Sequence, residues 1–284
     1  MTSSFESDGQ AALVLSADEL NRICQLLYLR TGMMFNEQKR YYIERRIADR
    51  MRVLGLTTAA SYLGLMVARP AETEALINAF TINETYFYRE ENQFAALSRS
   101  ILPQVVSKRR PGDLVRIWSL PCSTGEEPYS IAIWLLENWP LVDAWHVEIV
   151  GSDIDTEVLA RARRGRYGVR ALARLPSEIR DRYFGSETDQ EREIIDDLKE
   201  SVLFSQINLI EPASVAKERP FDVIFCRNLL IYFDDTSRQI AAANLFDRLN
   251  PGGFLCVGHT ESMSRIDERF EMVRFPDAIV YRRP

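Results

Sequence analysis

The stretch VRIWSLPCSTGEEPYSIAIWLLE at residues 115–137 is where we expect the working centre of the chain. Val115 and Ile117 belong to a short β-rich run, a cluster of small residues follows, and from Pro128 the apolar residues recur at helical spacing. Proline suits the first turn of a helix, because its missing N–H has no partner there. The stretch therefore predicts a strand, a tight loop and a helix, with Gly125 letting the backbone approach a ligand.

Two carboxylates, Glu126 and Glu127, stand at the start of this predicted helix. A dinucleotide enzyme binds its pyrophosphate at this position, on a glycine-rich turn and the helix N-terminus. Negative side chains repel phosphate, and the full glycine pattern is missing. The turn therefore favours a ligand with a positive group, although an ordinary buried strand–helix unit remains open.

Strands and helices alternate beyond this unit, which predicts a parallel sheet with helices on both faces. A second strand ends at Asp153, where a carboxylate commonly accepts ribose hydroxyls in nucleoside-binding folds. A later apolar strand ends at Cys226 and is followed by Arg227 and Asn228. Because ligands bind beyond the carboxyl ends of such strands, we expect these side chains and Asn208 in one crevice.

The remaining pattern divides the chain. Four short helices are predicted between Ser16 and Ala79, and an NPGG turn at 250–253 precedes the last parallel strand and a C-terminal hairpin. Residues 165–201 are charged and out of phase with the alternation, with candidate strands near 193–198. We expect a flexible tail at 1–16, a helical domain at 17–95, a linker at 96–112, and an α/β domain at 113–284 with an inserted β-subdomain at 165–201.

Composition narrows the class of protein. The 284 residues are 46% hydrophobic, enough for two domains with cores, and the net charge of −6 argues against gripping nucleic acid over the whole surface. Four scattered cysteines and two histidines predict neither a zinc site nor a disulfide framework. Without an apolar run of 18 residues or a signal-peptide pattern, we expect a cytoplasmic protein with no membrane insertion.

Positive charge is concentrated near the N-terminus. Residues 20–60 hold eight Lys and Arg against three Asp and Glu, a net charge of +5. Lys39, Arg46 and Arg50 fall in one stripe along the second predicted helix. Such a stripe is usually a solvated face, and a docking surface for an acidic partner is the alternative.

Six motifs, NETYFYRE, STGEEPYS, SDIDTEVL, INL, FCRNLLIYFD and GHTES, resemble the CheR family of chemotaxis receptor methyltransferases over nearly the whole chain. The resemblance implies methyl transfer from S-adenosylmethionine, which becomes S-adenosylhomocysteine, to glutamates of chemoreceptor cytoplasmic helices, without a metal. It also implies a small all-α N-terminal domain before a Rossmann-like methyltransferase domain that carries a β-subdomain. The residues it places around the cofactor are Asn83, Thr85, Arg89, Glu127, Asp153, Asn208, Leu209, Arg227 and Asn228.

Methyl transfer to a glutamate needs no general base, since a carboxyl with a pKa near ~4.3 is already ionised at neutral pH. The protein has to align the reactants and exclude water. We expect the Tyr232 hydroxyl to steer the acceptor carboxylate and Arg89 to orient the carboxylate of the cofactor. Burial of Tyr232 as a core aromatic is the alternative.

Three other functions compete with this prediction. A nicotinamide-dependent oxidoreductase would need the glycine fingerprint, and a nucleic-acid methyltransferase would need a base-stacking platform and a basic channel. A non-catalytic module that senses S-adenosylmethionine stays open.

The resemblance also implies partners. A glutamate-rich receptor bundle is acidic, which favours docking at Lys39, Arg46 and Arg50. In some members of the resembled family the β-subdomain captures a C-terminal receptor peptide as an added strand. Arginines available for its carboxylate are Arg170, Arg174 and Arg180.

Overall fold

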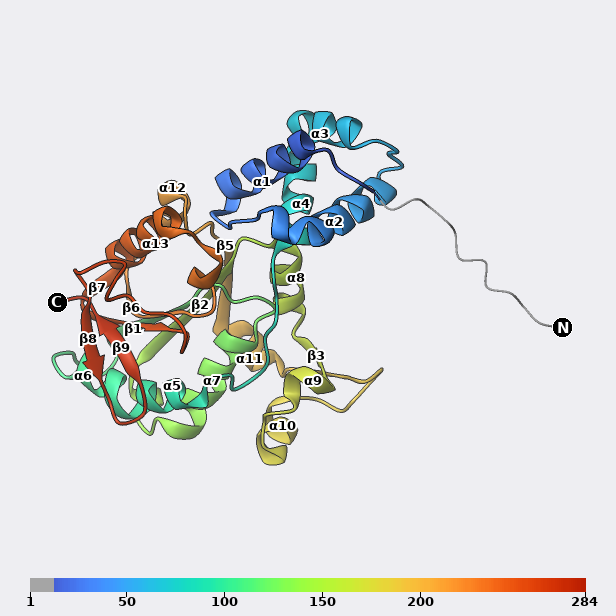
Figure 1. The fold of residues 1–284 in the computed structure, drawn as a ribbon. Helices are drawn as coiled ribbons and strands as arrows, with labels where there is room; N and C mark the ends of the chain where they lie inside the picture. The colour runs from blue at the N-terminus through green and yellow to red at the C-terminus, as the bar shows by residue number, and fades with distance from the viewer. Residues whose placement is uncertain (1–12) are drawn as a thin grey trace. The chain divides into compact units, whose positions relative to one another are not determined.

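The computed structural model describes residues 13–284, so most of the expected tail lies outside the described residues. Leu15, at its end, is buried, and its N–H donates to Glu44 over 3.0 Å. The described chain forms two compact units (Figure 1). The first runs to Phe80 and leaves out Thr31–Met33, and the second comprises Thr31–Met33 and Thr81–Pro284.

The first unit is the expected small helical domain. Ser16 and Glu19 form a capping box at its start, in which the Ser16 N–H donates to Glu19 over 2.9 Å and the Glu19 N–H donates to the Ser16 hydroxyl over 3.3 Å. Apolar residues at helical spacing, such as Ile43 and Ile47, are fully buried in its core. Its helices are α1 (Ala17–Thr31), η1 (Glu37–Lys39), α2 (Arg40–Val53), α3 (Ala59–Ala68) and α4 (Pro70–Phe80).

The second unit begins at Thr81, which corrects the boundaries expected at 95 and 113. The expected linker is helical, and it consists of α5 (Glu91–Ala96), the π-helical η2 (Leu97–Ile101) and α6 (Leu102–Val106). Its apolar residues share the core of the sheet: Phe94, Leu97, Ile101 and Leu102 are fully buried there. The boundary between the two units therefore lies before these helices, because their apolar face is buried against the sheet.

A seven-stranded sheet of order β5-β2-β1-β6-β7-β9-β8 forms the centre of this unit, confirming the α/β class. The pairs from β5 to β7 are parallel, and β9 and β8 add an antiparallel hairpin at one edge. In Figure 1, α12 and α13 lie on one side of the sheet and α5 to α7 on the other. The strands are β1 (Leu114–Ser119), β2 (His146–Asp153), β5 (Val202–Gln206), β6 (Phe221–Cys226), β7 (Leu249–Val257), β8 (Glu271–Arg274) and β9 (Ile279–Arg282). The crossover helices are α7 (Glu126–Asn138), α8 (Thr156–Arg164), α12 (Pro212–Val215) and α13 (Asp235–Arg248).

The strand order reverses at β1, which pairs with β2 on one side and β6 on the other. Ser119 at the end of β1 aligns with Gly151 of β2 and Phe225 of β6. The carboxyl ends of these three strands therefore meet, and this switch point is where open α/β sheets bind ligands.

Two local predictions were wrong: the candidate strands near 193–198 and the turn at 250–253. Candidate strands near 193–198 are instead β4 (Glu191–Glu193) and the helix α11 (Asp196–Ser201), whose acidic first turn favours a helix. The inserted two-stranded sheet is completed by β3 (Arg166–Gly168) and accompanied by α9 (Val169–Leu172) and α10 (Ser177–Tyr183).

The expected NPGG turn lies inside β7, where the pairing with β6 changes register between Phe221 and Val223. Gly253 allows this irregularity, because a Cβ there would lie 2.9 Å from the backbone carbonyl oxygens of Asn250 and Asp222.

Candidate functional site

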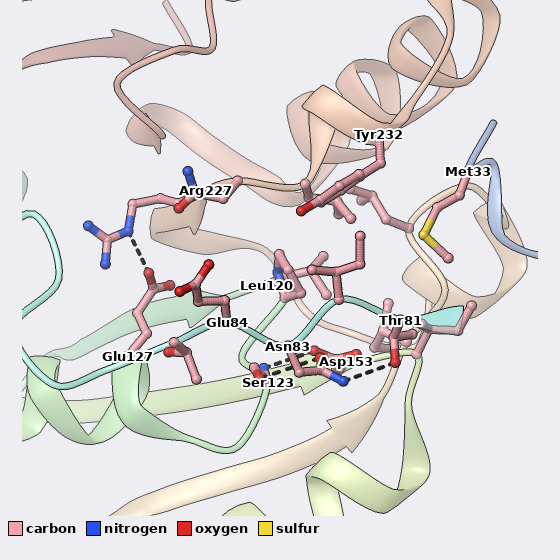
Figure 2. A pocket seen from close by; sticks show the side chains of 18 of the residues that line it. Met33, Thr81, Asn83, Glu84, Leu120, Ser123, Glu127, Asp153, Arg227 and Tyr232 are labelled. Atoms are coloured by element: carbon pink, nitrogen blue, oxygen red, sulfur yellow. Dashed lines mark hydrogen bonds and ion pairs between the residues drawn. The ribbon is translucent and has the colours of Figure 1, made fainter. Parts of the chain in front are cut away.

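A pocket in the second unit opens at the switch point (Figure 2). Its volume is about 960 Å³ when the open mouth is included. All nine residues expected around the cofactor line it, and so does Tyr232. The structure thus brings together every expected residue of this site, while their contacts with a cofactor stay a prediction. Further lining residues are Thr31, Met33, Thr81, Ile82, Glu84, Tyr86, Phe94, Leu120, Pro121, Ser123, Ile154, Ile207, Leu229 and Phe233.

Asp153 at the tip of β2 is buried in the pocket wall. Its Oδ2 accepts the Ser123 N–H over 2.8 Å, and its Oδ1 accepts the Asp155 N–H over 3.0 Å. Burial raises the pKa of Asp153 to about 6, although these N–H donors act in the opposite direction. Each oxygen keeps acceptor capacity, so the carboxylate can receive further hydroxyl donors.

Asp155 holds two elements of the site together, a role that sequence reasoning missed. Its Oδ1 caps α8 by accepting the N–H groups of Glu157 and Val158 over 2.9 and 3.1 Å. Its Oδ2 accepts the Thr81 hydroxyl over 2.5 Å and the Asn83 Nδ2 over 3.1 Å. The cap itself follows the local pattern of Asp before a helix. The hydrogen bonds from Thr81 and Asn83 span more than 70 positions, and no local sequence pattern predicts them.

Arg227 and Glu127 form a buried ion pair between β6 and α7, with Nε 2.5 Å from Oε2 (Figure 2). Glu127 also accepts the Ser119 hydroxyl over 2.7 Å, and Arg227 Nη1 donates to the Arg89 carbonyl over 2.8 Å. The guanidinium lies 5.2 Å from the ring centroid of Phe94. Arg227 is therefore held by protein groups on several sides, which fixes the pocket wall that it forms.

Arg89 and Tyr232 both line the pocket, although they are far apart in the sequence. Arg89 Nη1 donates to the Glu84 carbonyl over 2.7 Å, and its guanidinium lies 5.8 Å from the Tyr86 ring centroid. Tyr232 ends the 3-10 turn η4 (Leu230–Tyr232) and is only partly buried, so it is not a core aromatic.

Gly125 has a packing role inside the domain. It caps α7 with φ +94, and a Cβ there would lie 3.0 Å from both the Ala162 Cβ and the Tyr167 hydroxyl oxygen. Its place is set by close protein packing, and it is not among the described residues that line the pocket. Glu126 is buried beside Thr124, which donates to it over 2.6 Å, and burial raises its pKa. Of the two carboxylates, only Glu127 reaches the pocket wall, because successive helix side chains point in different directions.

The predicted docking stripe lies in the first unit, and its members differ in environment. Lys39 is exposed, and Arg46 lies with its guanidinium 5.2 Å from the Tyr42 ring centroid. Arg50 donates from Nε and Nη2 to Glu72 over 2.9 and 2.7 Å, and Tyr62 donates to the same carboxylate over 2.8 Å. Arg50 therefore stabilises the helical unit, and the docking prediction now depends on Lys39 and Arg46.

The pocket suits a nucleoside with a charged tail. Apolar Leu120, Ile154 and Ile207 can cover a base, Asp153 can accept ribose hydroxyls, and Arg89 can meet a carboxylate. Within residues 13–284, no cluster of three or more His, Cys, Asp or Glu side chains is arranged to hold a metal ion. No helix in that range has the length and apolar character needed to cross a bilayer.

The pocket lies at the switch point of the sheet and has a carboxylate, Asp153, at the end of the second strand. Without the glycine fingerprint of dinucleotide enzymes, these features define a Rossmann-like domain for another kind of nucleoside cofactor. Residues 83–279 match the CheR methyltransferase SAM-binding domain, and residues 18–81 match the CheR methyltransferase all-alpha domain. The chain belongs to the CheR methyltransferase family, and it is an S-adenosylmethionine-dependent methyltransferase. The first matched region ends at residue 81 and the second begins at residue 83, close to the division of the structure between Phe80 and Thr81.

Relatives match along almost their full length. Chemotaxis protein methyltransferase 2 of Vibrio cholerae is 43% identical, over 96% of this chain and 95% of that protein. Chemotaxis protein methyltransferase of Salmonella typhimurium is 38% identical, over 96% of each chain. Among solved structures, a putative class I S-adenosylmethionine-dependent methyltransferase from Listeria monocytogenes is 13% identical, with 94% of this chain and 88% of that chain covered and a TM-score of 0.42.

Proposed function

We propose that this methyltransferase acts in the cytoplasm on bacterial chemoreceptors, converting glutamate side chains of their cytoplasmic helices into methyl esters. The observation that carries the proposal is the convergence of Asp153, Arg89 and Tyr232 on one pocket in a chain of the CheR family. Relatives that carry the name chemotaxis protein methyltransferase support the same physiological setting.

The bound cofactor would supply a methyl group on a positively charged sulfur. An oxygen of an ionised glutamate would attack the methyl carbon without a general base, and the sulfur would leave as a neutral thioether. What remains for the protein is positioning, and well-oriented reactants gain roughly 7–11 kcal/mol over free encounter. The absence of histidine from the described lining of the pocket is consistent with this chemistry.

Three side chains have distinct roles in the proposal. Asp153 accepts the ribose hydroxyls, and Arg89 orients the carboxylate of the cofactor from its place beside Tyr86. Tyr232 donates one hydrogen bond to the acceptor carboxylate, which steers that group while leaving it nucleophilic. A bidentate arginine there would hold the acceptor more tightly and weaken its nucleophilicity.

Receptor docking is proposed at Lys39 and Arg46. A methyl-accepting bundle presents many glutamates, and opposite charges accelerate encounter and fix the orientation of the partners. Neither side chain has an ion-pair partner among the described residues.

A second contact is proposed at the inserted subdomain, where β3 and β4 form a two-stranded sheet to which a receptor C-terminal peptide could add a strand. Arg180 is the best placed of the three expected arginines, since its buried Nε has no hydrogen-bond partner among the described residues. It lines a pocket with Tyr167, Gln190 and Arg192. Arg170 already pairs with Glu84 over 3.0 Å, and Arg174 lies 5.8 Å from the Tyr86 ring centroid.

The test is transfer of radiolabelled methyl from S-adenosylmethionine to membranes that contain receptors of the same organism. We expect label on the receptor that mild base releases as methanol, as carboxyl esters do. Receptors with glutamine at their methylation sites serve as the control and should take up no label. Label that resists base, or transfer to the glutamine receptors at the same rate, would contradict glutamate as the acceptor.

A further inference from the structure

The backbone after β6 is irregular and carries five residues that line the pocket: Arg227, Asn228, Leu229, Tyr232 and Phe233. Asn228 has φ +59, in the left-handed region that non-glycine residues rarely adopt. The segment then makes the single 3-10 turn η4, which ends at Tyr232. One short turn contributes little stability by itself, so the position of Tyr232 depends on what holds this segment from outside.

Glu261, in the loop after β7, accepts two backbone N–H groups from this segment and one from its own loop. Its Oε2 accepts from Asn228 over 2.7 Å and from Gly258 over 2.8 Å, while its Oε1 accepts from Leu230 over 2.7 Å. Hydrogen bonds to an ionised acceptor are stronger than neutral ones. A single carboxylate thus fixes both the left-handed residue and the first residue of the turn that carries Tyr232.

Gly258 shows how closely these groups are packed. A Cβ at this position would lie 2.8 Å from both the Asn228 Nδ2 and the Glu261 Oε2, and 3.1 Å from the Asn228 backbone nitrogen. Any side chain at 258 would push Glu261 and Asn228 apart. Glycine at this position therefore lets Asn228 and Glu261 approach each other without displacement.

We propose that Glu261 is a positioning residue of the methyl-transfer site. It holds Asn228 and the Leu230–Tyr232 turn in the pocket wall, and it is not itself among the described residues that line the pocket. The inference rests on the proposed function for the role of Tyr232, and it assigns to Glu261 the geometry on which that role depends.

The first test is Glu261→Gln, with the exposed Glu268→Gln as a matched control for the loss of one charge. A glutamine amide replaces one acceptor oxygen by a donor, so at least one of the three N–H bonds is lost. Hydrogen exchange in peptides covering residues 227–233 should become about tenfold faster in Glu261→Gln, as expected for local opening, and stay unchanged in Glu268→Gln. Equal exchange in Glu261→Gln and wild type would overturn the proposal.

Kinetics separate positioning from a purely structural role. Because small misplacements of reacting groups are costly, single-turnover methylation should fall on the order of 100-fold in Glu261→Gln. Adding Tyr232→Phe should then cost little more, since a displaced hydroxyl has already lost its function. Fully additive losses, or a lower melting temperature with wild-type single-turnover rates, would overturn the proposal.

Gly258→Ala disturbs the contact between Glu261 and Asn228 without changing either residue. It keeps the proposal testable if Glu261→Gln does not fold. The backbone φ of Gly258 lies outside the left-handed region, so alanine strains only the contact with Asn228 and Glu261, and the same local exchange and rate changes are expected. Wild-type behaviour of Gly258→Ala would contradict the packing argument. If wild-type protein fails to methylate receptor glutamates, the proposed function fails, whereas exchange at 227–233 and calorimetric binding of S-adenosylhomocysteine still test Glu261.

Discussion

The Nε atom of Arg227 lies 2.5 Å from a carboxylate oxygen of Glu127, although the two residues are 100 positions apart. Their side chains are 3% and 12% exposed, so the pair is shielded from water. It ties the end of β6 to the first turn of α7, and through the Arg89 carbonyl it also holds the segment that carries Arg89. The pair therefore has a structural role beside the expected contact with the cofactor.

Removing one partner of this pair should be costly. Arg227→Ala leaves the Glu127 carboxylate buried without its cation, which we expect to lower the free energy of unfolding by about 3–5 kcal/mol. Urea denaturation measures the change. The control Arg166→Ala breaks the half-exposed pair with Glu191 and should cost under ~1 kcal/mol. Equal losses in the two variants would contradict the buried role.

Asp153 should make cofactor binding depend on pH. Its pKa is raised to about 6, and hydroxyl donors bind the ionised form, so affinity is full above this pH and falls as the pH drops through it. Calorimetry with S-adenosylhomocysteine should give about tenfold weaker binding at pH 5 than at pH 7, following proton linkage. Asp153→Asn should bind more weakly at pH 7 and lack this dependence. If the affinity of Asp153→Asn falls with pH as steeply as that of wild type, the titrating group is not Asp153.

Tyr232→Phe tests acceptor steering. The change removes one hydrogen bond to an ionised carboxylate, roughly 1.5–3 kcal/mol, which corresponds to a single-turnover rate on the order of ten to a hundred times lower. Binding of S-adenosylhomocysteine should stay within about twofold of wild type, because the proposed hydrogen bond goes to the acceptor. A variant that loses cofactor affinity and keeps its rate would place the hydroxyl on the cofactor instead.

Charge reversal at Lys39 and Arg46 tests docking. The Lys39→Glu, Arg46→Glu variant should methylate receptor more slowly, most clearly at low salt where charge interactions are least screened. Cofactor affinity should be unchanged. Arg50 is unsuitable for this purpose, because reversal there would set two carboxylates against each other at Glu72. If the variant methylates receptor at the wild-type rate in low salt, Lys39 and Arg46 belong to a solvated face and do not dock the receptor.

Arg180→Ala tests peptide capture by the inserted subdomain. If the Arg180 guanidinium contacts the terminal carboxylate, calorimetry with C-terminal receptor peptides should show binding to wild type and roughly tenfold weaker binding to the variant. An amidated peptide is the matched control and should also bind weakly. No binding to wild type, with full-length receptor still methylated, would remove the tether from the proposal.

Local patterns of the sequence predicted most elements and the position of several site residues. The Ser16–Glu19 capping box, the helical periodicity of α2 and the strand ending at Asp153 all depend on neighbours a few residues away. Because parallel strands deliver their carboxyl ends to one edge, knowing that Asp153 and Arg227 follow strands was enough to place them in one crevice.

Only the tertiary structure decided which groups meet. Gly125 packs closely against Tyr167, Arg50 is bound by Glu72, and Glu261 holds Asn228 across 33 positions. Periodicity records which face of an element is buried, but it contains no information about the charged or polar partner that a distant element supplies. Such pairings depend on how elements pack in three dimensions, which is why the sequence by itself determined the elements and the crevice while the folded chain determined the contacts within it.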